Sequence, residues 1–137
     1  MLDGRTMKTP CELVVWYVLP MIRRGLADEL IDRHHLKQSE VARLYGVTDS
    51  AISTYRSKKR GFHNQVVETK QYFDLKRLFE LGADKIMDGH SVQTVICDIC
   101  TDVKRSGLLD LIHEIVTGEN SNGRYAYNHV IFKVEQN

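Results

Sequence analysis

Hydrophobic residues recur every three or four positions along most of the chain, which is the spacing of an amphipathic helix. Ile22, Leu26 and Leu30 form one such stripe, and the segment 91–105 carries another. The pattern predicts an all-α fold, with helices over 10–19, 20–35, 38–46, 48–57, 65–88, 91–105 and 108–116. Loose alternation over 125–135 predicts one terminal strand, which needs a partner strand to be stable.

Local signals place the helix ends. Thr9 and Glu12 form a capping-box pattern around Pro10, which suits the first helical position. Pro20 lacks an N–H and clashes one turn back, so we expect a break or kink near Leu19. Gly82 predicts a loosened turn inside the long helix over 65–88.

The segment 38–55 predicts two short helices joined by a tight turn. Gly46 supplies the left-handed residue that ends the first helix, and Thr48 can cap the second. Ala42 is small where the two helices would cross. The residues expected on the two inner faces are Val41, Ala42, Tyr45, Ala51, Ile52 and Tyr55.

The outer face of the second helix carries short hydroxyl side chains, which permit close approach to base edges in a major groove. A basic cluster follows it, and basic residues bind backbone phosphates. Lys37 and Gln38 begin the first helix, where a phosphate can sit. The candidate DNA-binding residues are Lys37, Gln38, Thr48, Ser50, Ser53, Thr54, Arg56, Ser57, Lys58, Lys59 and Arg60.

The charge is uneven along the 137 residues. Residues 1–61 carry 11 Lys/Arg against 7 Asp/Glu, and residues 62–137 carry 8 against 11. A basic first half beside an acidic second half suggests a nucleic-acid module joined to something else. The longest apolar run, 11–19, is too short to cross a bilayer, and no signal peptide precedes it, so we expect a cytoplasmic protein without a membrane partner.

Counted from Gln38, alanine at the fifth position, glycine at the ninth and a branched apolar residue at the fifteenth match the lambda-repressor-like class of helix-turn-helix. Residues 9–24, 57–61 and 97–107 extend the similarity over most of 7–115. The chain thus resembles a family of predicted archaeal transcriptional regulators. The resemblance implies a DNA-binding domain over 9–61, a helical dimerisation or sensor module over 65–137, and a homodimer that regulates transcription on double-stranded DNA.

Three cysteines, an odd number, argue against a disulfide framework. Cys97 and Cys100 are three residues apart on a helix and can converge on one metal ion. The resemblance implies that Cys11 joins them with a fourth cysteine, whose place Asp110 takes here. Such a set would hold an iron–sulfur cluster or, as a second choice, zinc. The alternative is unligated thiols, with Cys11 packed as a small hydrophobe.

The sequence contains no glycine-rich phosphate loop, nucleophile elbow or paired-carboxylate signature, so we expect no enzymatic activity. A thiol oxidoreductase would need a βαβ context around Cys97 and Cys100. A helix-turn-helix also occurs in proteins that bind other proteins. The alternative function is therefore an antitoxin-like module or transcription-complex adaptor that binds no ligand.

Overall fold

The computed structural model describes residues 9–57, 66 and 69–118, and these residues are helical without any strand. The expected all-α class is therefore confirmed for this part of the chain, whereas the expected strand over 125–135 lies outside it. The elements are α1 (Pro10–Leu13), η2 (Val14–Val18), α2 (Leu19–Asp28), η3 (Glu29–Arg33), α3 (Gln38–Tyr45), α4 (Asp49–Ser57), α6 (Lys70–Met87), α7 (Val92–Arg105) and α8 (Leu108–Thr117), where η denotes a π-helix.

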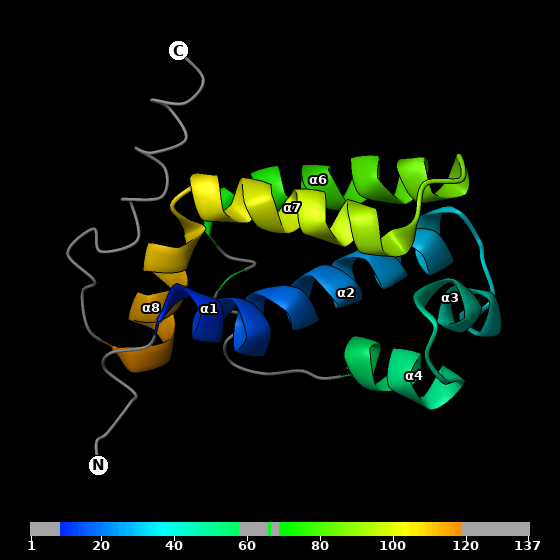
Figure 1. Cartoon of the computed structure of the whole chain (residues 1–137), viewed down its shortest axis with the longest axis horizontal. Helices are drawn as coiled ribbons and strands as arrows, with labels where there is room; N and C mark the ends of the chain where they lie inside the picture. The colour runs from blue at the N-terminus through cyan, green and yellow to red at the C-terminus, as the bar shows by residue number, and fades with distance from the viewer. Residues whose placement is uncertain (1–8, 58–65, 67–68, 119–137) are drawn as a thin grey trace.

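The central element is α2, which contacts α4, α6 and α7. In Figure 1, α6 and α7 lie side by side along one side of α2, and α4 lies on the other. The short helices α1 and α8 are in contact at the opposite end of α2 from α3. This arrangement leaves α3 and α4 together at one end of the molecule.

The first helix starts where the sequence predicts. Thr9 Oγ1 accepts from the Glu12 N–H at 3.2 Å, and Glu12 Oε1 accepts from the Thr9 N–H at 2.9 Å, so the capping box is confirmed. The chain does not break near Leu19. The chain instead widens into the π-helix η2, in which the Leu19 N–H donates to the Val14 carbonyl. Because Pro20 has no N–H to donate, the π-turn lets the helix continue past it.

The long predicted helix begins at Lys70 rather than at residue 65. Gly82 does not loosen it: a Cβ there would lie 2.8 Å from Val95 Cγ1, so this glycine permits close packing of α6 on α7. The Phe73 side chain of this helix is 74% exposed. The face that packs carries Leu75 and Phe79 instead.

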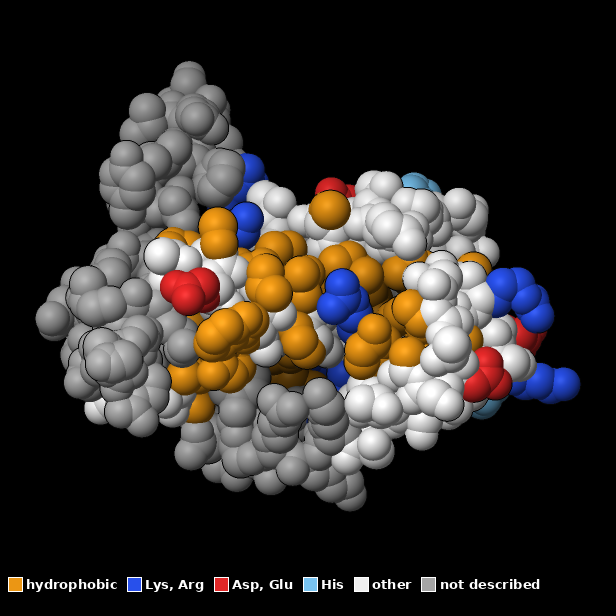
Figure 2. All heavy atoms as spheres, turned by 60° about the horizontal axis from the view of Figure 1, so that its bottom comes forward, with side chains coloured by type: hydrophobic (Ala, Val, Ile, Leu, Met, Phe, Trp, Pro, Cys, Tyr) orange, Lys and Arg blue, Asp and Glu red, His pale blue; other side chains and the backbone are white. Residues whose placement is uncertain are grey.

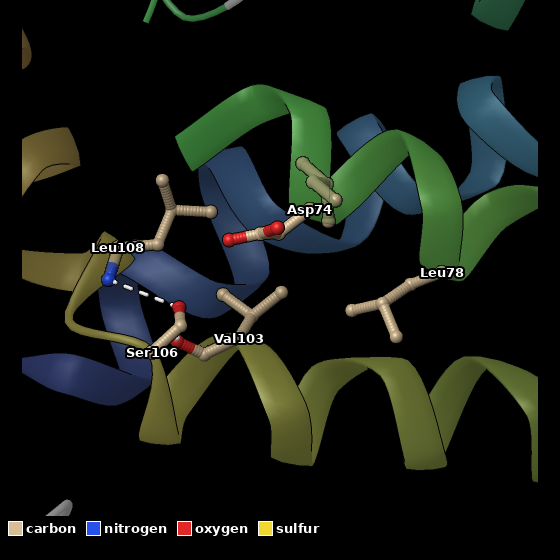
Figure 3. A pocket seen from close by; sticks show the side chains of 6 residues that line it. Asp74, Leu78, Val103, Ser106 and Leu108 are labelled. Atoms are coloured by element: carbon tan, nitrogen blue, oxygen red, sulfur yellow. Dashed lines mark hydrogen bonds between the residues drawn. The ribbon is translucent and has the colours of Figure 1, made fainter. Parts of the chain in front are cut away.

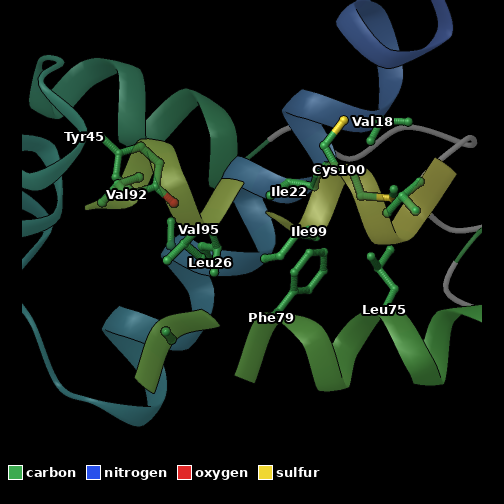
Figure 4. Close-up of a cluster of buried hydrophobic side chains, with 14 of the residues drawn as sticks. Val18, Ile22, Leu26, Tyr45, Leu75, Phe79, Val92, Val95, Ile99 and Cys100 are labelled. Carbon is green, nitrogen blue, oxygen red and sulfur yellow. The ribbon is translucent and has the colours of Figure 1, made fainter. Parts of the chain in front are cut away.

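One hydrophobic core includes side chains from both predicted domains. Ile22 and Leu26 of α2 lie in the same buried cluster as Phe79 of α6 and Ile99 of α7, and Figure 4 shows these four side chains close together. The predicted boundary between residues 61 and 65 lies outside the described residues. The packing of α2 therefore determines how α4 sits relative to α6 and α7.

Candidate nucleic-acid interface

The turn between α3 and α4 has the geometry that its residues predict. Gly46 has φ +72° and ends α3 in the left-handed region. The Val47 N–H donates to the Ala42 carbonyl at 3.0 Å. Thr48 Oγ1 accepts from the Ala51 N–H at 3.1 Å and caps α4, so both the glycine and the cap are confirmed.

The inner face of α4 packs against α2, and α3 packs against α4, α7 and η3. Ala42 and Ile52 are buried where the two helices meet. The Tyr45 hydroxyl donates to the Arg23 carbonyl of α2 at 2.6 Å. The centroids of the Tyr45 and Tyr55 rings lie 6.3 Å apart. Burial raises the pKa of the Tyr45 phenol well above its ordinary value, so the hydroxyl remains a hydrogen-bond donor. These contacts hold α3 and α4 as one unit on α2.

The start of α3 uses its two predicted DNA-binding residues in different ways. The Lys37 N–H donates to Glu40 Oε1 at 2.8 Å, and the Lys37 side chain is exposed. Because an ammonium group has no acceptor, this side chain cannot cap the N–H groups of α3. Gln38 Nε2 donates to the Asp49 carbonyl at 3.1 Å. Gln38 therefore connects the start of α3 with the start of α4, a role that its position in the sequence does not indicate.

The predicted hydroxyl face of α4 is confirmed as exposed. Ser50, Ser53, Thr54 and Ser57 all have exposed side chains. The Thr54 hydroxyl donates to the Ser50 carbonyl at 2.9 Å, one turn back along the helix. Because that proton is used within the helix, the outward lone pairs of Thr54 act as acceptors. Acceptors match the amino groups that adenine and cytosine present in the major groove.

Arg56 does not lie on this exposed face. Its Nε donates to Asp28 Oδ1 at 2.7 Å, and its Nη2 donates to Asp32 Oδ1 at 2.9 Å. The predicted contact between Arg56 and DNA therefore competes with an ion pair inside the protein. Nothing in the local sequence around Arg56 indicates these partners, which lie 28 and 24 residues earlier. The other basic residues of the predicted cluster, Lys58, Lys59 and Arg60, lie outside the described residues.

A second ion-pair network connects η3 with α6, and the sequence pattern does not predict it. Arg33 Nη2 lies 2.8 Å from Asp84 Oδ1 and donates to the Glu80 carbonyl at 2.9 Å, while its Nε donates to Glu29. His34 Nε2 lies 2.9 Å from the same Asp84 oxygen. The hydrogen bond from Arg33 lowers the pKa of the Asp84 carboxyl most, and the hydrogen bond with His34 lowers it further. The segment that leads into α3 is thus held to α6.

The structure does not bring the four predicted metal ligands together. Among the described residues, no three His, Cys, Asp or Glu side chains are grouped closely enough to hold a metal ion. Cys97 is exposed and Cys100 is buried on the same helix, whereas Asp110 lies on α8. The expectation that Cys11 packs in the core is wrong, since Cys11 is exposed. Burial raises the pKa of the Cys100 thiol, with Lys104 acting in the opposite direction.

A small pocket lies between α6, α7 and α8, and its volume is about 60 Å³. Figure 3 shows the lining side chains and the hydrogen bond from the Leu108 N–H to Ser106 Oγ, 3.2 Å long. Sites for organic ligands usually have volumes of about 300–1,000 Å³. The pocket therefore does not fit an organic effector. Its lining residues are Asp74, Leu75, Leu78, Val103, Ser106 and Leu108.

Within the part of the chain that the structure describes, no helix is both long enough and apolar enough to span a membrane. Comparisons of the chain with protein-family models, with curated proteins and with solved structures found no match. The candidate interface therefore rests on its own geometry.

Proposed function

We propose that α3 and α4 form a helix-turn-helix of the lambda-repressor-like class and that the protein is a sequence-specific, DNA-binding regulator of transcription. The observation that carries the proposal is the difference between the two faces of α4. Ile52 is fully buried against the neighbouring helices, whereas the opposite face presents only short hydroxyl side chains to solvent. An α-helix with such a face fits the major groove, where each base pair presents a distinct pattern of donors and acceptors.

Phosphate binding would come from residues that flank α4. The exposed Lys37 stands at the start of α3, and the sequence places Lys58, Lys59 and Arg60 directly after α4. Contacts of this kind position a protein on DNA and account for the salt dependence of its affinity. Base readout would then fall to the hydroxyl face of α4.

The proposed regulator acts as a homodimer. Two copies would present two α4 helices about 34 Å apart, one helical turn of DNA, and so read two half-sites. Sedimentation analysis of the protein alone and with duplex DNA measures this directly. A monomer that binds DNA with one protein per duplex would contradict the dimer and leave the DNA-binding proposal standing.

The experiment that tests the function is selection of duplexes from a random-sequence library, followed by measurement of Kd for the selected duplex and for a scrambled one. Thr54→Val should change which base is preferred, because it removes an outward acceptor from α4. Thr101→Val is a matched control: the Thr101 hydroxyl donates to the Cys97 carbonyl at 3.0 Å in the same way, but on α7. An unselective wild-type protein, or equal effects of both substitutions, would contradict the proposal.

The basic cluster has its own test. Lys58→Ala together with Lys59→Ala should weaken binding to every duplex alike. Each lost phosphate contact should lower the slope of log K against log [salt] by about 0.9. Circular dichroism checks that the variant is folded. An unchanged slope would mean that these lysines do not bind phosphate.

One observation favours the alternative of a protein-binding module. Two neighbouring hydrophobic residues of η2, Val15 and Trp16, are 56% and 54% exposed. Figure 2 shows hydrophobic side chains gathered on the face that forms the bottom of Figure 1. Exposed apolar side chains that lie next to one another in a patch are common at protein–protein contacts. The two functions differ in the selection experiment, since an adaptor would enrich no particular duplex.

A further inference from the structure

The guanidinium of Arg56 joins three elements of the fold. It stands in the last turn of α4, and it donates to Asp28 at the end of α2 and to Asp32 in η3. The two aspartates are four residues apart, so they project from the same side of that helix. A second cation, Arg24, lies 3.7 Å from the other oxygen of Asp28. The two carboxylates therefore face α4 as a pair, and Arg56 lies between them and α4.

The direction of Arg56 differs from that of the hydroxyl face. At about 100° per residue, position 56 lies roughly 110° from the centre of the face formed by Ser50, Ser53, Thr54 and Ser57. Its side chain is only 29% exposed, and both N–H groups that it uses are bound to carboxylates. To reach a phosphate, the guanidinium would have to leave two short hydrogen bonds. Asp32 would lose this partner and Asp28 would keep the longer contact with Arg24, 3.7 Å, so negative charge would be uncovered beside a polyanion.

The chemistry of the contact requires arginine. Nε and Nη2 are fixed relative to each other in one plane, so two bonds to two carboxylates determine the orientation of the side chain. A lysine ammonium is a single point charge and cannot impose that orientation. Ion pairs that are this exposed contribute little to global stability. Their larger effect is local, on the direction in which the last turn of α4 points.

We propose that Arg56 is a positioning residue of the DNA-binding site: it holds the end of α4 against α2 and η3, keeps Asp28 and Asp32 neutralised, and binds no phosphate. This inference rests on the proposed function. It replaces the expectation that Arg56 belongs to the phosphate-binding cluster with Lys58, Lys59 and Arg60. Sequence selectivity then depends on a residue that never touches DNA.

The test compares Arg56→Gln with Arg56→Lys and with a matched control, Arg77→Gln. Arg77 is an exposed arginine of α6 whose side chain lies 4.0 Å from Glu80, so its loss reports the effect of one positive charge elsewhere. Kd is measured at several salt concentrations for the selected duplex and for a scrambled duplex. Hydrogen exchange of the α4 backbone amides is measured without DNA.

We expect Arg56→Gln to reduce the ratio of affinities for the two duplexes by about threefold to tenfold. Its salt slope should equal that of Arg77→Gln. Arg56→Lys, although it keeps the charge, should lose part of the selectivity. The amides of the last turn of α4 should exchange faster in Arg56→Gln, and Asp28→Asn should produce the same change.

Two results would overturn the inference while the proposed function stands. The first is a salt slope lower by about 0.9 in Arg56→Gln than in Arg77→Gln, which would show a lost phosphate contact. The second is unchanged exchange of the α4 amides in Arg56→Gln. A wild-type protein with equal affinity for the selected and scrambled duplexes would instead overturn the proposed function, and the inference with it.

Discussion

Replacing Gly25 by alanine should destabilise the protein, although alanine is the better helix former. Gly25 lies inside α2, where the ring of Phe79 from α6 rests directly on its backbone. A Cβ at position 25 would overlap three carbons of that ring. The usual distance between carbons in contact is about 3.5–4.0 Å. The ring is almost completely buried, so it has no open space to move into.

The expected magnitude follows from two opposing effects. Alanine in place of glycine stabilises a helix interior by about 1 kcal/mol. Overpacking of a well-packed core costs about 1–3 kcal/mol, and an overlap with a whole ring belongs at the upper end. We therefore expect Gly25→Ala to lower the free energy of unfolding by about 1–2 kcal/mol. That corresponds to a decrease in Tm of roughly 3–8 °C for a chain of this size.

The assay is urea unfolding followed by circular dichroism, for Gly25→Ala in the wild type and in a Phe79→Leu background. Leucine removes the ring, so the same substitution should there become neutral or stabilising by up to about 1 kcal/mol. Gly82→Ala is a control for a second buried helical glycine. Its added Cβ would meet Val95 Cγ1 at 2.8 Å and the ends of two other aliphatic side chains at 3.1 Å. These can shift, so a smaller effect is expected.

Equal effects of Gly25→Ala in the two backgrounds would mean that the ring of Phe79 is not the cause of the destabilisation. A rise in Tm in the wild-type background would contradict the overlap between the added Cβ and the ring. Either result would mean that α2 and α6 do not approach each other as closely as described.

Three further predictions concern a turn, an ion pair and the thiols. Gly46→Val should cost about 1–3 kcal/mol, because φ +72° is strained for a β-branched residue even though no atom lies near the added Cβ; a variant that melts like the parent would contradict the turn. Asp84→Asn should lower Tm at neutral pH. Arg33 lowers the folded pKa of Asp84, so this contribution exists above the unfolded value of about 3.9 and is lost as pH falls through the folded value; the two melting temperatures should therefore converge in acid. Cys97 should react with a thiol reagent faster than the buried Cys100, whose raised pKa leaves less thiolate; a bound iron–sulfur cluster or zinc would instead protect Cys97, and metal analysis of anaerobically purified protein would detect it.

Parts of the candidate site could be predicted because they depend on neighbours along the chain. The cap at Thr48 and the left-handed Gly46 act within four residues, so their geometry is determined locally. The exposure of the hydroxyl face of α4 follows from the helical period in the same way. Periodicity failed where the period itself changes: η2 is a π-helix, and Cys11, which precedes it, is exposed rather than packed as a small hydrophobe.

Most helix positions, the capping box at Thr9 and the α3–α4 turn follow from the amino-acid sequence, because hydrogen bonds between residues three to five positions apart form these features. Which distant side chains meet depends on the tertiary packing. In the sequence, Arg56 looks like part of the basic cluster that follows α4. Its bonds to Asp28 and Asp32 exist because the fold places α4 beside these two residues. Gly25 carries no signal until Phe79, 54 positions later, rests on it. Long-range partners depend on how whole helices pack. The free energy that favours one packing comes from many contacts in the shared core, so no single position in the sequence indicates it.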